Sequence, residues 1–459
     1  MAWYFLSAGL ILGGQWAYEE LGWGGFWAWD PVENAAFMPW LTGTAFLHSV
    51  MIQEKRNMLK IWNVVLIILT FGLTIVGTFL TRSGIINSVH AFTQSEIGPA
   101  FLIFLALILV IGFALLFKRI QMLESEEKIE YVLCRENVFL AQNVLLVGIA
   151  FTVLLGTTFP LLAEAVRGTK LSIQAPFFNT IIAPMGYMLL LLMGIGMLIA
   201  WRKSSWEGLL RNFKNPVILA TGGTVFLAWF LSDRNLLWSV HTIFWLSIFV
   251  TATIVLELVK AVQAKSSQTE SNYLKGLYYV ISRNPRRYGG LLIHFGVVLM
   301  FLGFAGTFFK VERNMTLESG IPTQIGEYSL VFQQVEEFKV GNATHRAAIV
   351  EVFDKEGNLL EVLKPAKSFY PTQPQPLTEV AILRSFLEDL YLIFSSENGG
   401  EQGSVTLRVF INPLIGWSWM ALPVFTLGVG LSMSYRPKSL VAHETILRER
   451  YLAAQATSS

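Results

Sequence analysis

The sequence has little charge and almost no cysteine. Only 14% of its 459 residues are charged and 53% are hydrophobic, whereas about a quarter of the residues of a soluble globular domain are charged. This deficit indicates that lipid is the solvent for much of the chain. The single cysteine, Cys134, excludes an internal disulfide, a CxxC redox pair and a CxxCH motif. Any thiol chemistry would therefore use the thiols of a partner.

The first apolar run is not expected to be a removable signal peptide, and no fixed-period internal repeat is found. The first apolar run starts almost at Met1, without a positively charged segment before it or a small-residue cleavage site after it. Many apolar runs approach or reach the roughly 20 residues that a helix needs to cross the hydrocarbon core. Runs of this length span lipid as helices, because a helix satisfies its own backbone groups. The sequence predicts about ten: 2–17, 37–53, 61–81, 98–117, 137–162, 177–201, 216–232, 238–261, 288–310 and 414–434.

Lys and Arg are scarce in every second linker between these runs. The net charge of +2 gives no reason to expect a nucleic-acid partner, but the placement of the cations is informative. They gather after the even-numbered runs, around Lys55, Lys118, Arg202, Lys260 and Arg436. By the positive-inside rule, both termini are expected in the cytoplasm. The segments expected on the outer face are 18–36, 82–97, 163–176 and 311–413.

The segment 311–413 differs in character from the rest. Short runs rich in branched and aromatic residues, such as 347–353 and 405–410, alternate with turn signals at 354–358 and 397–400. We therefore predict an all-α polytopic membrane protein of about ten transmembrane helices with a small β-rich outward-facing domain. The expected boundaries are 1–310 for the helical core, 311–413 for the β-rich domain, 414–434 for the last span and 435–459 for a cytoplasmic tail.

A tryptophan-rich loop stands out at residues 16–40. Indole side chains at a membrane surface are often an interfacial belt that anchors helix ends. This loop has more of them than a belt needs, and glycines lie between them. The alternative is a platform for a large flat apolar ligand, because indole faces stack on π-systems and glycine lets the backbone approach closely. Both interpretations stay open on physical grounds. The residues are Trp16, Gly22, Trp23, Gly24, Gly25, Trp27, Trp29 and Trp40.

The run Asp30-Pro31-Val32-Glu33 raises the question of a catalytic carboxylate pair. Asp at the N-cap, Pro at the first helical position and Glu at the third are, however, the signature of a helix start with a capping box. We favour this second interpretation, in which Asp30 and Glu33 position the loop rather than transfer protons.

Two of the six histidines, His48 and His294, lie inside predicted spans. An ionisable residue within the membrane is costly, so a functional role is the default hypothesis. His48 lies roughly 9 Å from the cytoplasmic end of its span and His294 roughly 10 Å from the same side, at 1.5 Å per residue. Two histidines at matching depth could be the axial ligands of one haem iron. Alternatively, each donates a hydrogen bond to a neighbouring helix.

A third histidine, His90, lies in an outward loop on the same face as the tryptophans. It could ligate an iron held there, and Arg82 near the membrane surface could pair with a propionate. A lone loop histidine is more often solvated. No role is assigned to His241, His345 or His443.

The motifs resemble a known family. The run Trp23-Gly-Gly-Phe-Trp-Ala-Trp-Asp-Pro-Val-Glu-Asn-Ala35, closing with Pro39-Trp40, resembles the WWD signature of haem-handling proteins in cytochrome c biogenesis. The later motifs resemble the bacterial haem lyase subunit CcmF, and the resemblance covers essentially the whole chain. These are 77–84, 88–92, 143–146, Pro176-Phe-Phe-Asn-Thr180 and the β-rich domain before the last span.

The resemblance implies roles for particular positions. His48 and His294 match the two intramembrane histidines that hold a resident haem b, and His90 matches the second of two outward ligands of delivered haem. The WWD loop would engage haem that the chaperone CcmE delivers. The loop residues concerned are Trp23, Gly24, Gly25, Trp27, Trp29, Asp30, Pro31, Glu33 and Asn34.

The implied function is that of a cytochrome c haem lyase subunit in the bacterial inner membrane. It would join haem, its substrate, to the CxxCH thiols of apocytochrome c, with thiol-handling chaperones of the CcmH type as partners and quinol as a candidate electron donor. The resemblance implies further spans before this region, carrying the first outward histidine, so we expect either a truncated sequence or a separate N-terminal half as a partner. The rivals are a non-catalytic haem-binding or haem-translocating scaffold, and a paralogue dedicated to one cytochrome such as nitrite reductase.

Overall fold

The protein is described from a computed structural model, which covers residues 1–83, 97–125, 127, 129–169, 171, 173–232, 236–270, 272–373, 375–398 and 403–434. Helices dominate it. In chain order they are α1 (Ala2–Glu20), α2 (Pro31–Arg56), α3 (Lys60–Arg82), α4 (Gly98–Lys118), α5 (Ile120–Leu123), α6 (Arg135–Arg167), α7 (Ala175–Leu198), α8 (Trp206–Phe230), α9 (Trp238–Thr269), α10 (Tyr273–Arg283), α11 (Pro285–Gly306) and α12 (Ile415–Met433).

Each of the ten apolar runs expected to span the membrane lies in or overlaps one of these helices. Within the described residues, eight are long and apolar enough to cross a membrane, namely α2, α3, α4, α6, α7, α9, α11 and α12. Helices α1 and α8 are outside this set, so the number of spans stays a prediction. The fold class is confirmed: the chain is a multi-pass helical membrane protein with a separate β domain.

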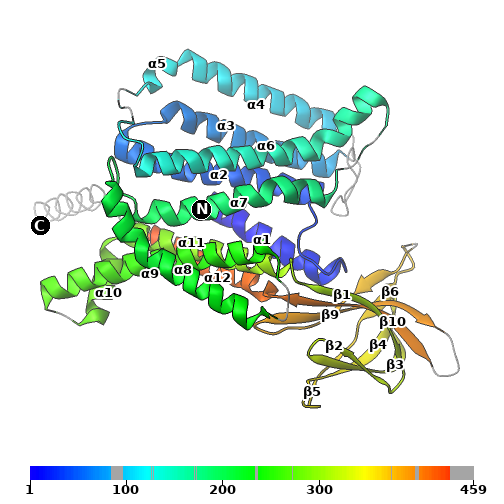
Figure 1. Ribbon diagram of the computed structural model, residues 1–459. Helices are drawn as coiled ribbons and strands as arrows, with labels where there is room; N and C mark the ends of the chain where they lie inside the picture. The colour runs from blue at the N-terminus through cyan, green and yellow to red at the C-terminus, as the bar shows by residue number, and fades with distance from the viewer. Residues whose placement is uncertain are drawn as a thin grey trace, which may run out of the picture.

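The helices form two groups (Figure 1). Helix α2 packs on α3 and α6, and α4 and α7 complete this first group. In the second group, α11 packs on α12 and α9, with α8 and α1 beside them. Contacts between α7 and α9 and between α1 and α2 join the two groups. The seam between them is therefore lined by α2 and α7 on one side and by α1, α9 and α11 on the other.

The close fit of α11 on α12 depends on small residues. A Cβ at Gly296 would lie 2.5 Å from the Phe425 ring, which is closer than real Cβ atoms come to a neighbour. Glycines at such positions let helix backbones approach in lipid, where apolar burial gives no drive for association.

The β domain contains all ten described strands. They are β1 (Val311–Glu318), β2 (Pro322–Ile325), β3 (Tyr328–Val340), β4 (Ala343–Phe353), β5 (Leu359–Leu363), β6 (Ala366–Phe369), β7 (Leu377–Glu379), β8 (Ala381–Leu383), β9 (Glu388–Asn398) and β10 (Ser404–Pro413).

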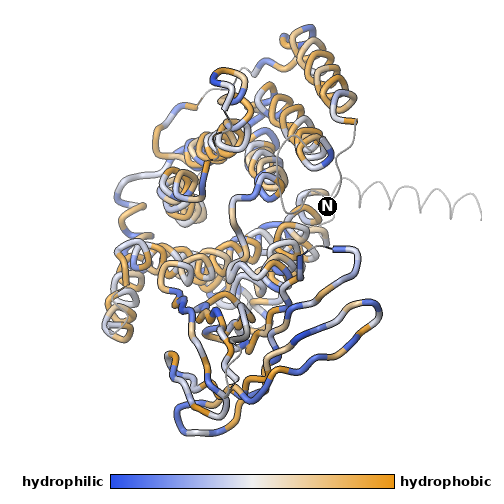
Figure 2. Tube along the Cα trace, turned by 90° about the vertical axis from the view of Figure 1, so that its right-hand side faces the viewer, coloured by the Kyte–Doolittle hydropathy of each residue, from blue (hydrophilic) through white to orange (hydrophobic). Residues whose placement is uncertain are grey.

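The strands form two antiparallel sheets with an apolar core between them. One sheet has the order β1-β10-β9-β8 and the other β2-β3-β4-β6-β7, with β5 paired to β4. Leu330, Val350, Leu392 and Leu407, two from each sheet, are fully buried in this core. Figure 2 shows the difference from the helices: the sandwich alternates between hydrophilic and hydrophobic residues, whereas the helices are mostly hydrophobic. This alternation is the pattern of strands with one face buried and one in water.

The sandwich lies at one end of the helix groups (Figure 1). Its first strand follows α11 and its last strand leads into α12, so both of its ends are tethered to the second group. The loop between α1 and α2, residues 21–30, contains Trp23, Trp27 and Trp29 and lies at this same end. It is shorter than the segment 16–40 that the sequence indicated, because Trp16 lies in α1 and Trp40 in α2.

Candidate functional site

The tryptophan loop enters α2 through a complete capping box, as the sequence predicts. Asp30 Oδ1 accepts a hydrogen bond from the Val32 backbone N–H at 2.9 Å, and Glu33 Oε2 accepts one from the Asp30 N–H at 3.0 Å. Glu33 Oε2 also accepts the Ala28 N–H at 2.9 Å. One carboxylate therefore binds two backbone N–H groups at the end of the loop, and Pro31 occupies the first helical position. This arrangement supports positioning as the task of Asp30 and Glu33.

The second half of the loop is fastened to the first helix group. Trp29 stacks on Phe178 of α7 with ring centroids 4.9 Å apart, and its indole N–H donates to Asn179 Oδ1 at 2.8 Å. Asn34 is buried and its amide donates to the Trp29 carbonyl and to Thr157 Oγ1 of α6, each at 3.0 Å. Trp29 has a φ of +59°, which is uncommon for a bulky side chain. This backbone is held by contacts on both sides of the residue.

Trp27 lies at the centre of an aromatic array. Its ring makes edge contacts with Trp29 at 5.8 Å and with Phe37 at 5.7 Å, and Phe37 stacks on Trp40 at 5.8 Å. Trp27 also packs against a buried cluster that includes Phe26 and residues of the sandwich. The indole is only partly buried. The array therefore extends from the second helix group to the first and presents Trp27 where they meet.

The first half of the loop is fastened to the sandwich. A Cβ at Gly24 would lie 2.5 Å from the Phe410 ring of β10, and Gly24 has a φ of +67°. Phe26 stacks on Phe304 of α11 and makes an edge contact with Trp419 of α12. Gly24 thus has a packing role that the sequence interpretation did not assign. Gly25, by contrast, has no atom within 4 Å of its Cβ direction, so its backbone is open to a ligand.

A buried polar cluster joins α1 to the sandwich just before this loop. The Tyr18 hydroxyl donates to Asp389 Oδ2 of β9 at 3.3 Å and accepts a hydrogen bond from Asn412 Nδ2 of β10 at 3.0 Å. Tyr18 is 0% exposed and Asp389 1% exposed. Burial raises the pKa of Asp389 to about 6, against hydrogen bonds from the Ser385 backbone and Tyr18 that lower it.

We expect Asp389→Asn to remove a pH dependence of stability between about pH 4 and pH 6. The pKa of Asp389 is about 6 in the folded chain against 3.8 for a free side chain, so the folded state holds the extra proton in this window. The wild type should then lose stability as the pH rises through the window, by at most about 3 kcal/mol. The measurement is the melting temperature of wild type and variant from pH 4 to pH 7, and parallel profiles would contradict the assignment.

Other ionisable groups near Asp389 leave this sign unchanged. Burial raises the pKa of each of the three tyrosines, so they stay protonated throughout this window, and Glu388 and Arg384 are present in both proteins. These neighbours are Tyr18 of α1, Tyr328 of β3, Tyr391 and Glu388 of β9, and Arg384.

His48 and His294 face each other across the seam between the two helix groups. Their ring centroids are 5.9 Å apart and their planes differ by 65°. His48 Nδ1 lies 2.9 Å from the Thr44 carbonyl and His294 Nδ1 lies 2.6 Å from the Gly290 carbonyl, each one turn back in its own helix. Because a carbonyl only accepts, Nδ1 of each ring carries the proton. The Nδ1 groups therefore bond within their own helices, in contrast to the alternative of bonds to neighbouring helices.

The chemistry of this donor set fits a haem iron that both histidines would hold. The tautomer leaves the Nε2 lone pair of each imidazole available, which is the form that binds metals. The two rings, with centroids 5.9 Å apart on different helices, are the residues that would hold such a group. A carbonyl that orients Nδ1–H is also the usual outer contact of a metal-binding histidine.

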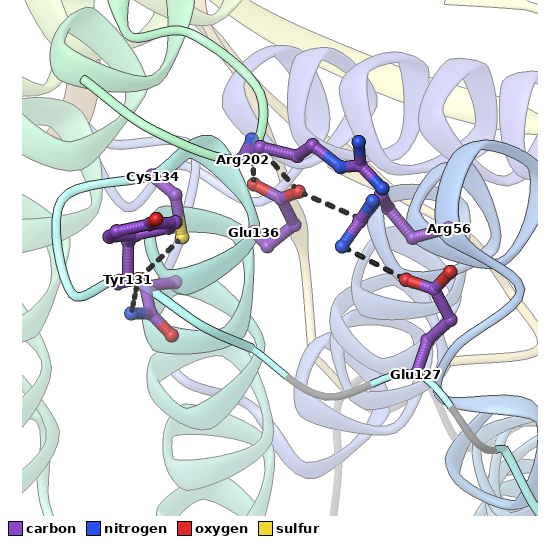
Figure 3. A network of polar contacts seen from close by, with 7 residues as sticks. Arg56, Glu127, Tyr131, Cys134, Glu136 and Arg202 are labelled. Atoms are coloured by element: carbon purple, nitrogen blue, oxygen red, sulfur yellow. Dashed lines mark hydrogen bonds and ion pairs between the residues drawn. The ribbon is translucent and has the colours of Figure 1, made fainter.

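An ionic network, drawn in Figure 3, joins α2 to the start of α6 at the end where α2 finishes. Arg56 at the end of α2 pairs with Glu127 at 3.0 Å and with the buried Glu136 of α6 at 3.3 Å. Both Glu136 oxygens also accept the Arg202 backbone N–H at 3.1 Å. The network holds α2 antiparallel to α6 about two turns beyond His48. It thereby fixes the depth at which His48 is presented.

The other predicted site residues lie elsewhere. Arg82 is in the last turn of α3, whereas His90 and His443 are outside the described residues. His345 bonds to Ser368 in the sandwich through Nδ1 at 2.7 Å. His241 is in α9, with Nδ1 3.0 Å from the Leu237 carbonyl. Among the described residues, no group of three His, Cys, Asp or Glu side chains is placed to hold a metal ion.

Sequence reasoning missed the contacts that hold the loop. No sequence pattern indicated that Tyr18, Asp389 and Phe410 contact one another or the loop. They are single residues in one helix and two strands that lie far apart in the chain. Phe178 and Asn179 did carry a sequence signal, since both fall in the run Pro176–Thr180 that the family resemblance includes.

Comparisons with known proteins agree with these features. The family described as "Cytochrome C assembly protein" matches residues 1–86, and the family described as "CcmF C-terminal beta-sandwich" matches residues 308–413. The cytochrome c-type biogenesis protein CcmF of Pseudomonas fluorescens is 35% identical, over 91% of this chain and 61% of its own length. CcmF of Escherichia coli is 33% identical, over 95% of this chain and 65% of its own length.

A solved structure has the same fold. The protein named "Cytochrome c Heme Lyase CcmF" aligns with a TM-score of 0.75 and 33% identity, over 94% of this chain and 64% of that one. The chain spans somewhat less than two thirds of the length of these relatives. Family profiles at both ends, relatives over nearly the whole chain and a shared fold agree: the chain belongs to the CcmF family.

Proposed function

We propose that this chain is the core of the membrane subunit of a cytochrome c haem lyase. It takes haem from the chaperone CcmE and promotes thioether attachment to the CxxCH segment of apocytochrome c. The observation that carries the proposal is the WWD loop, whose aromatic array is held from both sides while Gly25 and part of Trp27 stay open. A lyase needs such a rigid surface, because attachment depends on which haem face and edge meet the thiols.

The chemistry needs no nucleophile from this chain. Each cysteine S–H of the apocytochrome adds across a vinyl C=C of haem, forming one C–S and one C–H bond with no leaving group. What the protein supplies is orientation, which converts an encounter into an effectively intramolecular step. In this proposal Trp23, Trp27 and Trp29 flank the haem plane, Gly24 and Gly25 shape the loop, and Asp30, Pro31, Glu33 and Asn34 fix its exit into α2.

A resident haem b would be held by His48 and His294. When bound, it supplies one-electron chemistry by which the iron of delivered haem is reduced, with quinol as the candidate donor. The chain's own part is to fix both imidazoles as neutral Nδ1–H tautomers at one depth. His90 would ligate delivered haem and Arg82 would pair with a propionate carboxylate.

The orientation follows the charge pattern. The loop and the sandwich would face the periplasm of a bacterium, and the network at Arg56 and Glu136 the cytoplasm. Apocytochrome c and thiol-handling chaperones of the CcmH type are the proposed partners. Both would meet the chain on the face that carries the loop.

Replacing Trp27 by alanine should reduce covalent haem attachment at least about fivefold. The array loses its central indole, on which stacking worth about 1 kcal/mol or more depends. The measurement is haem-stained cytochrome c in a complementation strain, relative to the amount of this chain in the membrane. Trp238→Ala is the matched control, since Trp238 is 73% exposed at the start of α9. Full attachment with Trp27→Ala would refute the role of the loop. The alternative of a non-catalytic haem-binding scaffold would then remain.

A further inference from the structure

We infer that the β-sandwich is the anchor of the WWD loop, and that Tyr18, Asp389 and Asn412 are positioning residues for haem bound there. The inference rests on the proposed function and deepens it, because it assigns a task to the sandwich. The observation behind it is a buried hydrogen-bonded junction between α1 and strands β9 and β10. Its α1 residue, Tyr18, lies three residues before the loop begins.

The junction is built to hold one geometry. The Tyr18 hydroxyl is used twice, as donor to Asp389 and as acceptor from Asn412, and all three side chains are at most 6% exposed. The Tyr18 ring also lies 5.0 Å from Tyr391 and 6.0 Å from Trp419. A buried carboxylate with specific partners is expensive to displace. Sliding α1 against the sandwich would break all of these contacts together.

Further contacts continue the junction along the loop. Glu19 forms an ion pair with Arg384, which precedes β9. A Cβ at Gly22 would lie 3.0 Å from Thr378 of β7, and Gly24 lies against Phe410 of β10. Each residue type suits its contact, since both glycines have positive φ and no room for a side chain. The first half of the loop is thus shaped on the sandwich surface, whereas its second half is shaped on α6 and α7.

Trp27 lies where these two supports meet. It packs with Phe26 in the sandwich-facing cluster and makes edge contacts with Trp29 and Phe37, which belong to the other support. Its orientation therefore depends on the sandwich and the first helix group being held in register. A loop fastened on one side only would present Trp27 in many orientations, and haem affinity would fall by the cost of ordering it.

The test compares two tyrosines of the same helix in the full-length protein. Tyr18→Phe removes the hydroxyl that joins the sandwich. Tyr4→Phe removes a hydroxyl that bonds Thr426 of α12 at 2.8 Å, about 20 Å away along α1. Ferric haem is titrated into each purified protein and followed by quenching of tryptophan fluorescence, with deuterium uptake of residues 21–30 measured before haem is added.

We expect Tyr18→Phe to weaken haem binding about tenfold, which is the order of magnitude expected for losing a hydrogen bond to a charged group. It should also raise deuterium uptake in the loop. Tyr4→Phe should change neither. The double variant Tyr18→Phe/Asp389→Leu separates positioning from stability, because it removes the buried charge. Its melting temperature should recover while haem affinity stays low. Recovery of affinity together with stability would overturn the inference.

Trp27→Ala in the same titration distinguishes the two proposals. If it weakens haem binding and Tyr18→Phe does not, the sandwich is not the anchor and the proposed function stands. If neither variant changes the affinity, haem does not use the loop and both proposals fail.

Discussion

Substitution of His48 or His294 by alanine should abolish a bis-histidine haem b spectrum of the purified protein. The two rings are 5.9 Å apart on helices of different groups, and each Nδ1–H is bonded to a carbonyl one turn back. Loss of one ring removes one axial ligand, and no other described histidine lies within reach. The measurement is the reduced-minus-oxidised absorption spectrum together with the haem content of the protein.

His241→Ala is the matched control for this experiment. His241 also bonds a carbonyl one turn back in its helix, at 3.0 Å, but its ring is not paired with a second imidazole. Its replacement should leave the spectrum as in the wild type. An unchanged spectrum in both His48→Ala and His294→Ala would contradict the assignment of these two residues as ligands of a resident haem.

The second large effect is expected from Gly24→Ala. The new methyl group would lie 2.5 Å from the Phe410 ring, and the φ of +67° is strained for any residue with a Cβ. The left-handed backbone costs about 1–2 kcal/mol, and overpacking adds about 1–3 kcal/mol. The loop should leave the sandwich, with loss of haem binding in the titration described above and increased protease cleavage near residue 24.

Gly25→Ala and Phe410→Ala provide the controls. A methyl group at Gly25 meets nothing within 4 Å, and its φ is not in the left-handed region, so the free loop should keep its structure. Combining Gly24→Ala with Phe410→Ala removes the overlap but not the backbone strain, and should restore part of the protease resistance. If Gly24→Ala and Gly25→Ala have the same effect, contact with Phe410 does not explain the glycine.

The candidate site divides into local and non-local parts. The capping box at Asp30 and Glu33 was predicted because its partners are three residues apart and the rule is geometric. The pairing of His48 with His294 was a hypothesis from matching depth, and the structure brings the two rings together. The sequence interpretation treated the loop glycines as one set, whereas Gly24 is packed and Gly25 is open. The difference between the two glycines arises from β10, whose Phe410 packs on Gly24 and does not reach Gly25.

By itself the sequence determined what depends on solvent and on neighbouring residues. Long apolar runs must be helices in lipid, alternating runs with turn signals must pair as strands, and Asp-Pro-Val-Glu must start a helix, because each preference acts over a few residues. Tertiary structure alone decided which surfaces meet. Tyr18 lies 371 residues from Asp389 and Trp29 lies 150 residues from Asn179, and such pairs form only when whole helices and sheets have packed. The support of the loop on both sides is therefore a property of the fold, while its chemistry is a property of the sequence.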